Sequence, residues 1–172
     1  MYQQKTYRIL AILQALFILA FIPFAREIER VFLQVSRFLD LSPRALLYLG
    51  LMITTLLWIY IERINFRKTN IQALFISGFF FFICLYLVQS NAEFFHIFLY
   101  APLAIFTYFA FTFYIQKTYI CKTFLYCNLI SLADELLQGL HPERFFDFQD
   151  LLLNCATIAF GLSLVYLRQK SS

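Results

Sequence analysis

The sequence predicts an all-α polytopic membrane helix bundle, with about six transmembrane helices and one interfacial amphipathic helix. Of its 172 residues, 62% are hydrophobic and only 14% are charged, and the mean hydropathy is +0.72. Soluble domains are about half apolar and about a quarter charged. The apolar residues fall into long runs separated by short polar turns, which is the arrangement expected of membrane spans.

The N-terminal part predicts a membrane span followed by a surface helix. Residues 9–24 resemble a signal peptide but lack a small-x-small cleavage site, so we expect a retained first helix. In residues 25–40, apolar side chains recur at helical spacing, while Arg26, Arg30 and Arg37 occupy other faces. This pattern predicts an amphipathic helix that lies in the membrane interface and does not cross the bilayer.

Five more apolar runs predict the remaining spans: residues 45–61, 71–88, 94–115, 123–138 and 151–167. Several are shorter than the roughly 20 residues that cross a bilayer unaided, so we expect tilt or local thinning. The run at 123–138 is short and carries polar groups. Because the chain has only four glycines and four prolines, no linker divides it, and we expect one membrane domain over residues 1–172.

The distribution of Lys and Arg predicts that both termini lie in the cytoplasm. Nine of the 14 basic residues fall in segments on the side of the N-terminus and five on the other side. The arginines of the interfacial helix count against this orientation. The net charge of +4 fits basic cytoplasmic loops better than a nucleic-acid surface. The four cysteines are widely spaced and form no C-x-x-C pair, so we expect buried thiols, with no metal or cofactor.

Three spans carry a polar stripe, and ionisable residues at membrane depth usually mark function. Spacings of three and four place each set on one helical face. The stripes are Glu93, His96 and Tyr100; Asn128, Ser131, Glu135 and Gln138; and Asp150, Asn154, Thr157 and Gly161, with Asp147 one turn upstream. All three are densest at the same end of the bundle, which is the outer end in the predicted orientation.

A purely structural explanation of these stripes also has to be weighed. Asn, Ser and Gln can bond to one another across helix interfaces, and Thr157 and Gly161 are small enough to permit close packing. Asp147 could cap the last helix. However, several carboxylates, an arginine and a histidine at one end of a small bundle exceed what packing requires. We therefore expect a site there.

The order of polar residues in the C-terminal half forms a pattern: Glu135, Gln138, Pro142, Arg144, Asp147, Asp150 and Asn154, with aliphatic residues at 151–153. Together with Glu93, His96 and Tyr100, this pattern resembles the VanZ-like family of small bacterial integral membrane proteins. Thr157 stands where the family has its first Gly, and Gly161 fills the second Gly position. The resemblance covers about residues 93–167 and implies a multi-pass protein of the bacterial cytoplasmic membrane.

Two functions compete at this point. The first is a cell-envelope protein whose extracytoplasmic pocket binds a lipid headgroup, a lipid-linked envelope precursor or a glycopeptide-like ligand. Arg144 would pair with an anionic group, and Glu135, which we expect to be buried, would depend on Arg144. The family is named for a member associated with teicoplanin resistance, so the resemblance implies a link to antibiotic resistance.

The second function is an enzyme acting on a lipid-linked substrate. His96 would be the general base, oriented by Glu93 or Glu135, or else His96 and the carboxylates would bind a metal. The chain has no nucleophile motif and no H-E-x-x-H spacing, which favours the binding function. A transport pathway is disfavoured because the polar stripes fade toward the inner face and no inverted repeat is visible.

Overall fold

Helices account for all the regular structure in the part of the chain that the computed structural model describes, residues 2–62, 71–112, 117–142 and 145–171. A 3-10 turn, η1 (Ile22–Phe24), joins the first two helices. In chain order these are α1 (Tyr2–Phe21), α2 (Ala25–Phe38), α3 (Pro43–Glu62), α4 (Ile71–Leu87), α5 (Asn91–Phe111), α6 (Lys117–Leu140) and α7 (Phe148–Ser171). The predicted all-α bundle is confirmed, with its elements in the predicted order.

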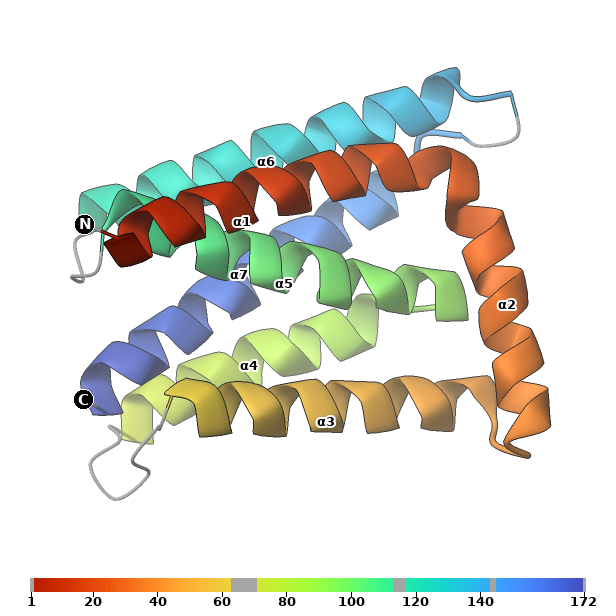
Figure 1. Cartoon of the computed structure of the whole chain (residues 1–172), viewed down its shortest axis with the longest axis horizontal. Helices are drawn as coiled ribbons and strands as arrows, with labels where there is room; N and C mark the ends of the chain where they lie inside the picture. Colours follow the sequence, from red (N-terminus) through yellow and green to blue (C-terminus); the bar gives the residue numbers. More distant parts are fainter. Residues whose placement is uncertain (1, 63–70, 113–116, 143–144, 172) are drawn as a thin grey trace.

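Helices α5 and α7 form the centre of the bundle, and α1, α4 and α6 pack around them (Figure 1). One buried apolar cluster joins α1, α5, α6 and α7. A second cluster joins α3, α4, α5 and α7. Because α5 and α7 belong to both clusters, the polar residues on these two helices are held by the most rigid part of the fold.

The close approach of α5 and α7 depends on Gly161. A Cβ atom at this position would lie 2.6 Å from the carbonyl oxygen of Ala101 and 3.0 Å from the Cβ of Ala104. Such a Cβ would overlap the α5 backbone, so only glycine fits without a shift of the helices. The predicted role of Gly161 in close packing is confirmed. Thr157, one turn earlier, is fully buried, and its Oγ1 lies 3.6 Å from the Sγ of Cys84 on α4.

The outer surface is suited to lipid. Among the described residues, three helical segments are long and apolar enough to cross a membrane: Gln4–Phe24, Asn91–Phe111 and Phe148–Arg168. Pro43–Thr54 and Ile71–Leu87 are shorter apolar segments, and α4 exposes large aromatic side chains. Water-soluble monomers rarely expose so much apolar surface. The chain is therefore a membrane protein, while the count of about six spans stays a prediction.

Helix α2 runs across the ends of the other helices rather than alongside them (Figure 1). Its sequence is strongly amphipathic. Phe32 packs edge-on against Phe95 of α5 with ring centroids 5.4 Å apart, which attaches α2 to the bundle. Val31, Val35 and Phe38 on its apolar face stay exposed. This arrangement is what the predicted interfacial helix requires.

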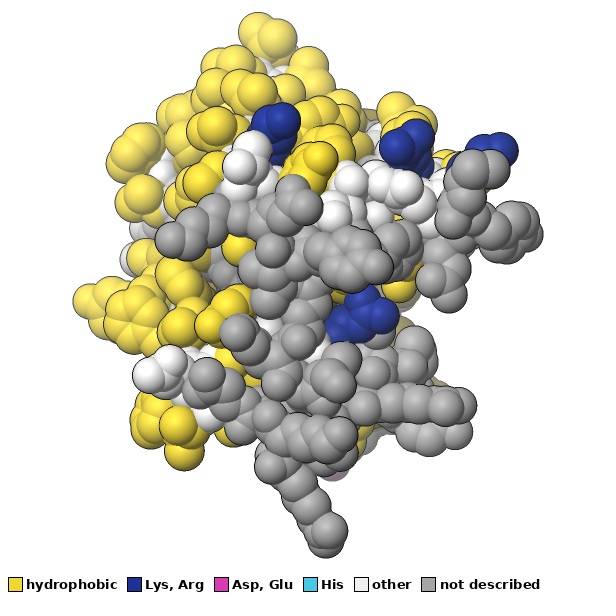
Figure 2. All heavy atoms as spheres, turned by 90° about the vertical axis from the view of Figure 1, so that its left-hand side faces the viewer, with side chains coloured by type: hydrophobic (Ala, Val, Ile, Leu, Met, Phe, Trp, Pro, Cys, Tyr) yellow, Lys and Arg dark blue, Asp and Glu magenta, His cyan; other side chains and the backbone are white. Residues whose placement is uncertain are grey.

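The end of the bundle that holds both termini carries basic side chains. Both termini lie at one end (Figure 1), and Lys and Arg side chains lie among hydrophobic ones there (Figure 2). The N-termini of α5 and α7 and the C-terminus of α6 lie at the opposite end. The three predicted polar stripes therefore start from the same end of the molecule.

Candidate functional site

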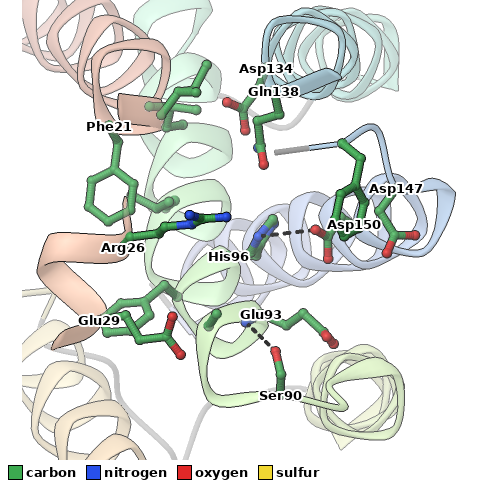
Figure 3. A pocket seen from close by; sticks show the side chains of 16 residues that line it. Phe21, Arg26, Glu29, Ser90, Glu93, His96, Asp134, Gln138, Asp147 and Asp150 are labelled. Atoms are coloured by element: carbon green, nitrogen blue, oxygen red, sulfur yellow. Dashed lines mark hydrogen bonds and ion pairs between the residues drawn. The ribbon is translucent and has the colours of Figure 1, made fainter. Parts of the chain in front are cut away.

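A cavity of about 280 Å³ lies at the end of the bundle opposite to the termini (Figure 3). Its walls come from α1, η1, α2, α5, α6 and the start of α7. It is lined by Ile18, Phe21, Ile22, Arg26, Glu29, Ser90, Ala92, Glu93, Phe95, His96, Leu99, Asp134, Gln138, Phe145, Asp147 and Asp150. The lining thus combines an apolar side, mainly from α1, η1 and α5, with a polar side.

His96 is the most constrained polar group of this cavity. Its side chain is buried, its Nδ1 lies 2.6 Å from Oδ1 of Asn154, and its Nε2 lies 3.9 Å from Oδ2 of Asp150. In this orientation the amide oxygen of Asn154 can only accept, so Nδ1 carries a proton and donates it. Nε2 is then directed at Asp150, where it can accept or donate a proton. Asn154 and Asp150 on α7 therefore fix the imidazole in position.

Asp134 was not recognised as a site residue from the sequence. The hydroxyl of Tyr100 donates a 2.7 Å hydrogen bond to Oδ2 of Asp134, and both side chains are buried. This bond joins α5 to α6 beside the cavity. A signal was present, because Asp134 lies three residues after Ser131 and four before Gln138, on the face of the predicted stripe.

Glu135 lies behind the cavity wall and is fully buried. Its Oε2 accepts a 3.4 Å hydrogen bond from the backbone N–H of Asp147, and its Oε1 accepts a 3.5 Å bond from Nε2 of Gln138. These contacts tie the end of α6 to the segment that precedes α7. Arg144, the predicted partner of Glu135, lies outside the described residues, and that pairing stays a prediction.

Two helix caps position carboxylates at the cavity. Oγ of Ser90 accepts a 3.2 Å bond from the backbone N–H of Glu93, and Oε2 of Glu93 accepts a 2.7 Å bond from the N–H of Gln89. This exchange resembles a capping box at the start of α5. Asp147 caps α7, because its Oδ1 accepts a 2.8 Å bond from the N–H of Gln149. The predicted capping role of Asp147 is confirmed.

The side chain of Gln149 joins α7 to the connection between α4 and α5. Its Nε2 donates a 3.1 Å bond to the carbonyl oxygen of Leu87. Its Oε1 accepts a 3.1 Å bond from Nε2 of Gln89. This side chain was also missed from the sequence, because its partners are more than 50 residues away along the chain.

Arg26 and Glu29 reach the site from α2, directly after the 3-10 turn. Figure 3 shows the guanidinium of Arg26 extending into the cavity toward His96, with Glu29 beside it. From the sequence, Arg26 was assigned only to a polar face of an interfacial helix, and Glu29 was not singled out. Their place in the cavity depends on the direction in which α2 crosses the bundle, and helical periodicity carries no information about this direction.

Eight of the nine predicted site residues are described. Five line the cavity and three lie directly behind it: Glu93, His96, Gln138, Asp147 and Asp150, then Tyr100, Glu135 and Asn154. The expectation that Glu93 or Glu135 orients His96 is wrong. The imidazole contacts Asn154 and Asp150 instead, because α7 packs on that face of α5.

Within the described ranges, no group of three or more His, Cys, Asp or Glu side chains is arranged to hold a metal ion. The described cysteines are free thiols. Cys84 and Cys127 are buried as expected, but the expectation is wrong for Cys121, which is exposed, and for Cys155, which is only partly buried. The polar groups of the site are therefore arranged as hydrogen-bond donors, acceptors and charges around a cavity.

The fold and the cavity define a small helical membrane protein with a polar site at one end of its bundle. Residues 9–169 match the VanZ/LLP1 family, and the chain belongs to this family. The match extends well before residue 93, where the predicted resemblance began, and so includes α2 with Arg26 and Glu29. No curated protein and no solved structure gave a match.

Proposed function

We propose that this protein resides in the bacterial cytoplasmic membrane and binds an envelope lipid headgroup or a glycopeptide-like ligand in its cavity. The observation that carries the proposal is the cavity of about 280 Å³, with an apolar side and convergent polar side chains. Ligand pockets usually measure roughly 300–1,000 Å³ and combine these two features. The volume lies just below this range and suits a headgroup better than a whole lipid.

The proposed orientation places the cavity outside the cell and both termini in the cytoplasm. Basic residues near the termini support it, because cytoplasmic segments are enriched in Lys and Arg. A role in teicoplanin-type resistance, which we also propose, rests on the family alone. It requires the outward-facing cavity of the proposed orientation, because such compounds act from outside the cell.

Impermeant thiol labelling tests the orientation. In a cysteine-free background, Asn91→Cys and Pro142→Cys should both react in intact cells, whereas Lys122→Cys should react only after lysis. The first two positions lie near the cavity and Lys122 lies at the other end of α6. Reaction of Lys122→Cys alone in intact cells would reverse the orientation. Reaction of Asn91→Cys without Pro142→Cys would contradict the arrangement of the spans.

Ligand-induced stabilisation tests the binding function. A ligand that binds only the folded protein raises its stability by about 2.7 kcal/mol at a concentration of 100 Kd. We expect at least one of teicoplanin, short-chain phospholipids and lipid-linked precursors to raise the Tm of the purified protein. Asp150→Asn should remove this rise. Glu27→Gln, on the exposed part of α2, should keep it. If no compound raises the Tm, the cavity is not a binding site of the proposed kind.

The geometry of His96 supports a second candidate, an enzyme acting on a lipid-linked substrate. An imidazole held by an amide oxygen on Nδ1, with Nε2 directed at a carboxylate and a cavity, has the arrangement of a general base. Mass spectrometry of lipid-linked substrates incubated with the protein would detect turnover. His96→Ala should abolish any product. Substrates that remain intact with the wild-type protein would exclude this candidate.

A further inference from the structure

The acidic residues of the chain are concentrated at the cavity. Its lining contains five of the ten Asp and Glu residues in the sequence: Glu29, Glu93, Asp134, Asp147 and Asp150. They come from α2, α5, α6, the segment before α7, and α7 itself. Over the part of the chain that the structure describes, the lining has one guanidinium, that of Arg26, and one imidazole, that of His96. The negative charge of the lining therefore exceeds its positive charge.

This imbalance bears on the ligand. Like charges in a partly enclosed site repel more strongly than in water. Among the described lining residues, an anionic ligand would meet five carboxylates and one guanidinium. A ligand with an ammonium group would meet opposite charges, and the three N–H donors of an ammonium need several acceptors. The lining thus repels anions and attracts cations. A site that combines such attraction and repulsion discriminates between the two kinds of ligand.

The guanidinium of Arg26 lies among the carboxylates of the cavity. In Figure 3, Arg26 extends between Glu29 and Asp134 toward His96, while Glu93 and Asp147 lie toward one side. Guanidinium groups pair in a bidentate way with phosphate oxygens. A ligand that carries both a phosphate and an ammonium could place the phosphate at Arg26 and the ammonium among the carboxylates.

The apolar part of the lining determines where the acyl chains of a lipid ligand could lie. Ile18, Phe21 and Ile22 form it on the side of α1 and η1. Acyl chains could therefore remain against this apolar surface while only the headgroup enters the cavity of about 280 Å³.

We infer that the cavity binds the headgroup of an aminophospholipid, in which an ammonium group is joined to a phosphate, as in phosphatidylethanolamine. This inference rests on the proposed binding function and names its ligand class. Carboxylates of the lining, Glu29 among them, receive the ammonium, and Arg26 receives the adjacent phosphate. Selectivity over anionic lipids follows from the excess of carboxylates.

Calorimetric titration of the purified full-length protein with dihexanoyl phospholipids tests the inference. The wild-type protein should bind dihexanoyl phosphatidylethanolamine about 10-fold more tightly than dihexanoyl phosphatidylglycerol, a difference of about 1.4 kcal/mol. Glu29→Gln should reduce this preference, and Arg26→Gln should weaken the binding of both lipids. Glu27→Gln is the matched control, because Glu27 lies on the same helix, pairs with Arg30 at 2.8 Å and does not line the cavity.

The possible outcomes separate the inference from the proposed function. Equal or tighter binding of phosphatidylglycerol would overturn the aminophospholipid inference while leaving a lipid-binding cavity. Binding of teicoplanin with neither phospholipid would also overturn it and would favour the glycopeptide ligand. If Glu29→Gln and Glu27→Gln both retain the full lipid preference, the carboxylates do not select the headgroup. Failure of every compound to bind would overturn the proposed function as well.

Discussion

Gly161→Ala is expected to destabilise the protein by about 1–3 kcal/mol, the usual cost of overpacking a tight interior. The added methyl group would lie 2.6 Å from the carbonyl oxygen of Ala101. This neighbour is backbone and cannot rotate away as a flexible side chain can, so α5 and α7 must separate. Because both helices carry walls of the cavity, ligand binding should fall together with the Tm. Thermal denaturation of the purified variant measures the effect.

Gly78→Ala on α4 is the matched control for this experiment. A Cβ at Gly78 would meet nothing within 4 Å. Alanine also favours a helix over glycine by about 1 kcal/mol in soluble hosts. We therefore expect the Tm of Gly78→Ala to be equal to or slightly above that of the wild type. Equal losses in the two variants would show that glycine is needed for a reason other than the close approach of α5 and α7.

Removing either partner of the bond between His96 and Asn154 is expected to abolish function while leaving a folded protein. Either change leaves the other side chain without the hydrogen bond that orients it at the cavity. Each of His96→Ala and Asn154→Ala should therefore weaken ligand binding about 10-fold or more, which is about 1.4 kcal/mol of binding free energy. The double variant should be little worse than either single one, because both changes disable the same unit. Growth of a complemented deletion strain on teicoplanin and the ligand affinity of purified protein are the measurements.

Asn128→Ala provides the comparison for this second prediction. Its Nδ2 donates a 2.8 Å bond to the carbonyl oxygen of Phe124 within α6, and Asn128 does not line the cavity. We expect this variant to keep both binding and complementation. If the His96 and Asn154 variants instead lose function only in proportion to lost protein abundance, their polar groups serve helix packing and form no site.

The order and type of the helices could be predicted because they depend on local patterns. Apolar runs and polar turns mark the spans, and the spacing of apolar residues in 25–40 identifies α2 as amphipathic. The same local regularity placed Glu93 with His96, and Asp150 with Asn154, each pair on one face. The structure brings these two faces together, since α5 and α7 pack against each other.

The partners across helices could not be predicted, because they depend on how the helices rotate and cross. The imidazole of His96 contacts α7 rather than a glutamate of α5 or α6. Asp134 was overlooked beside Glu135, although only Asp134 lines the cavity. Arg26 enters the site because α2 turns across the bundle after η1. These contacts are between helices, and residue spacing within one helix carries no information about them.

Arg26 and Glu29 reach the cavity from α2, a helix that lies across the ends of the others (Figure 1). The bonds between Tyr100 and Asp134 and between His96 and Asn154 instead join α5 to α6 and α5 to α7. Exchanges on α2 would therefore alter one wall of the cavity without replacing any residue of these two bonds. Within such a fold, a lineage can acquire a new ligand by changing a peripheral helix, and an engineer can do the same.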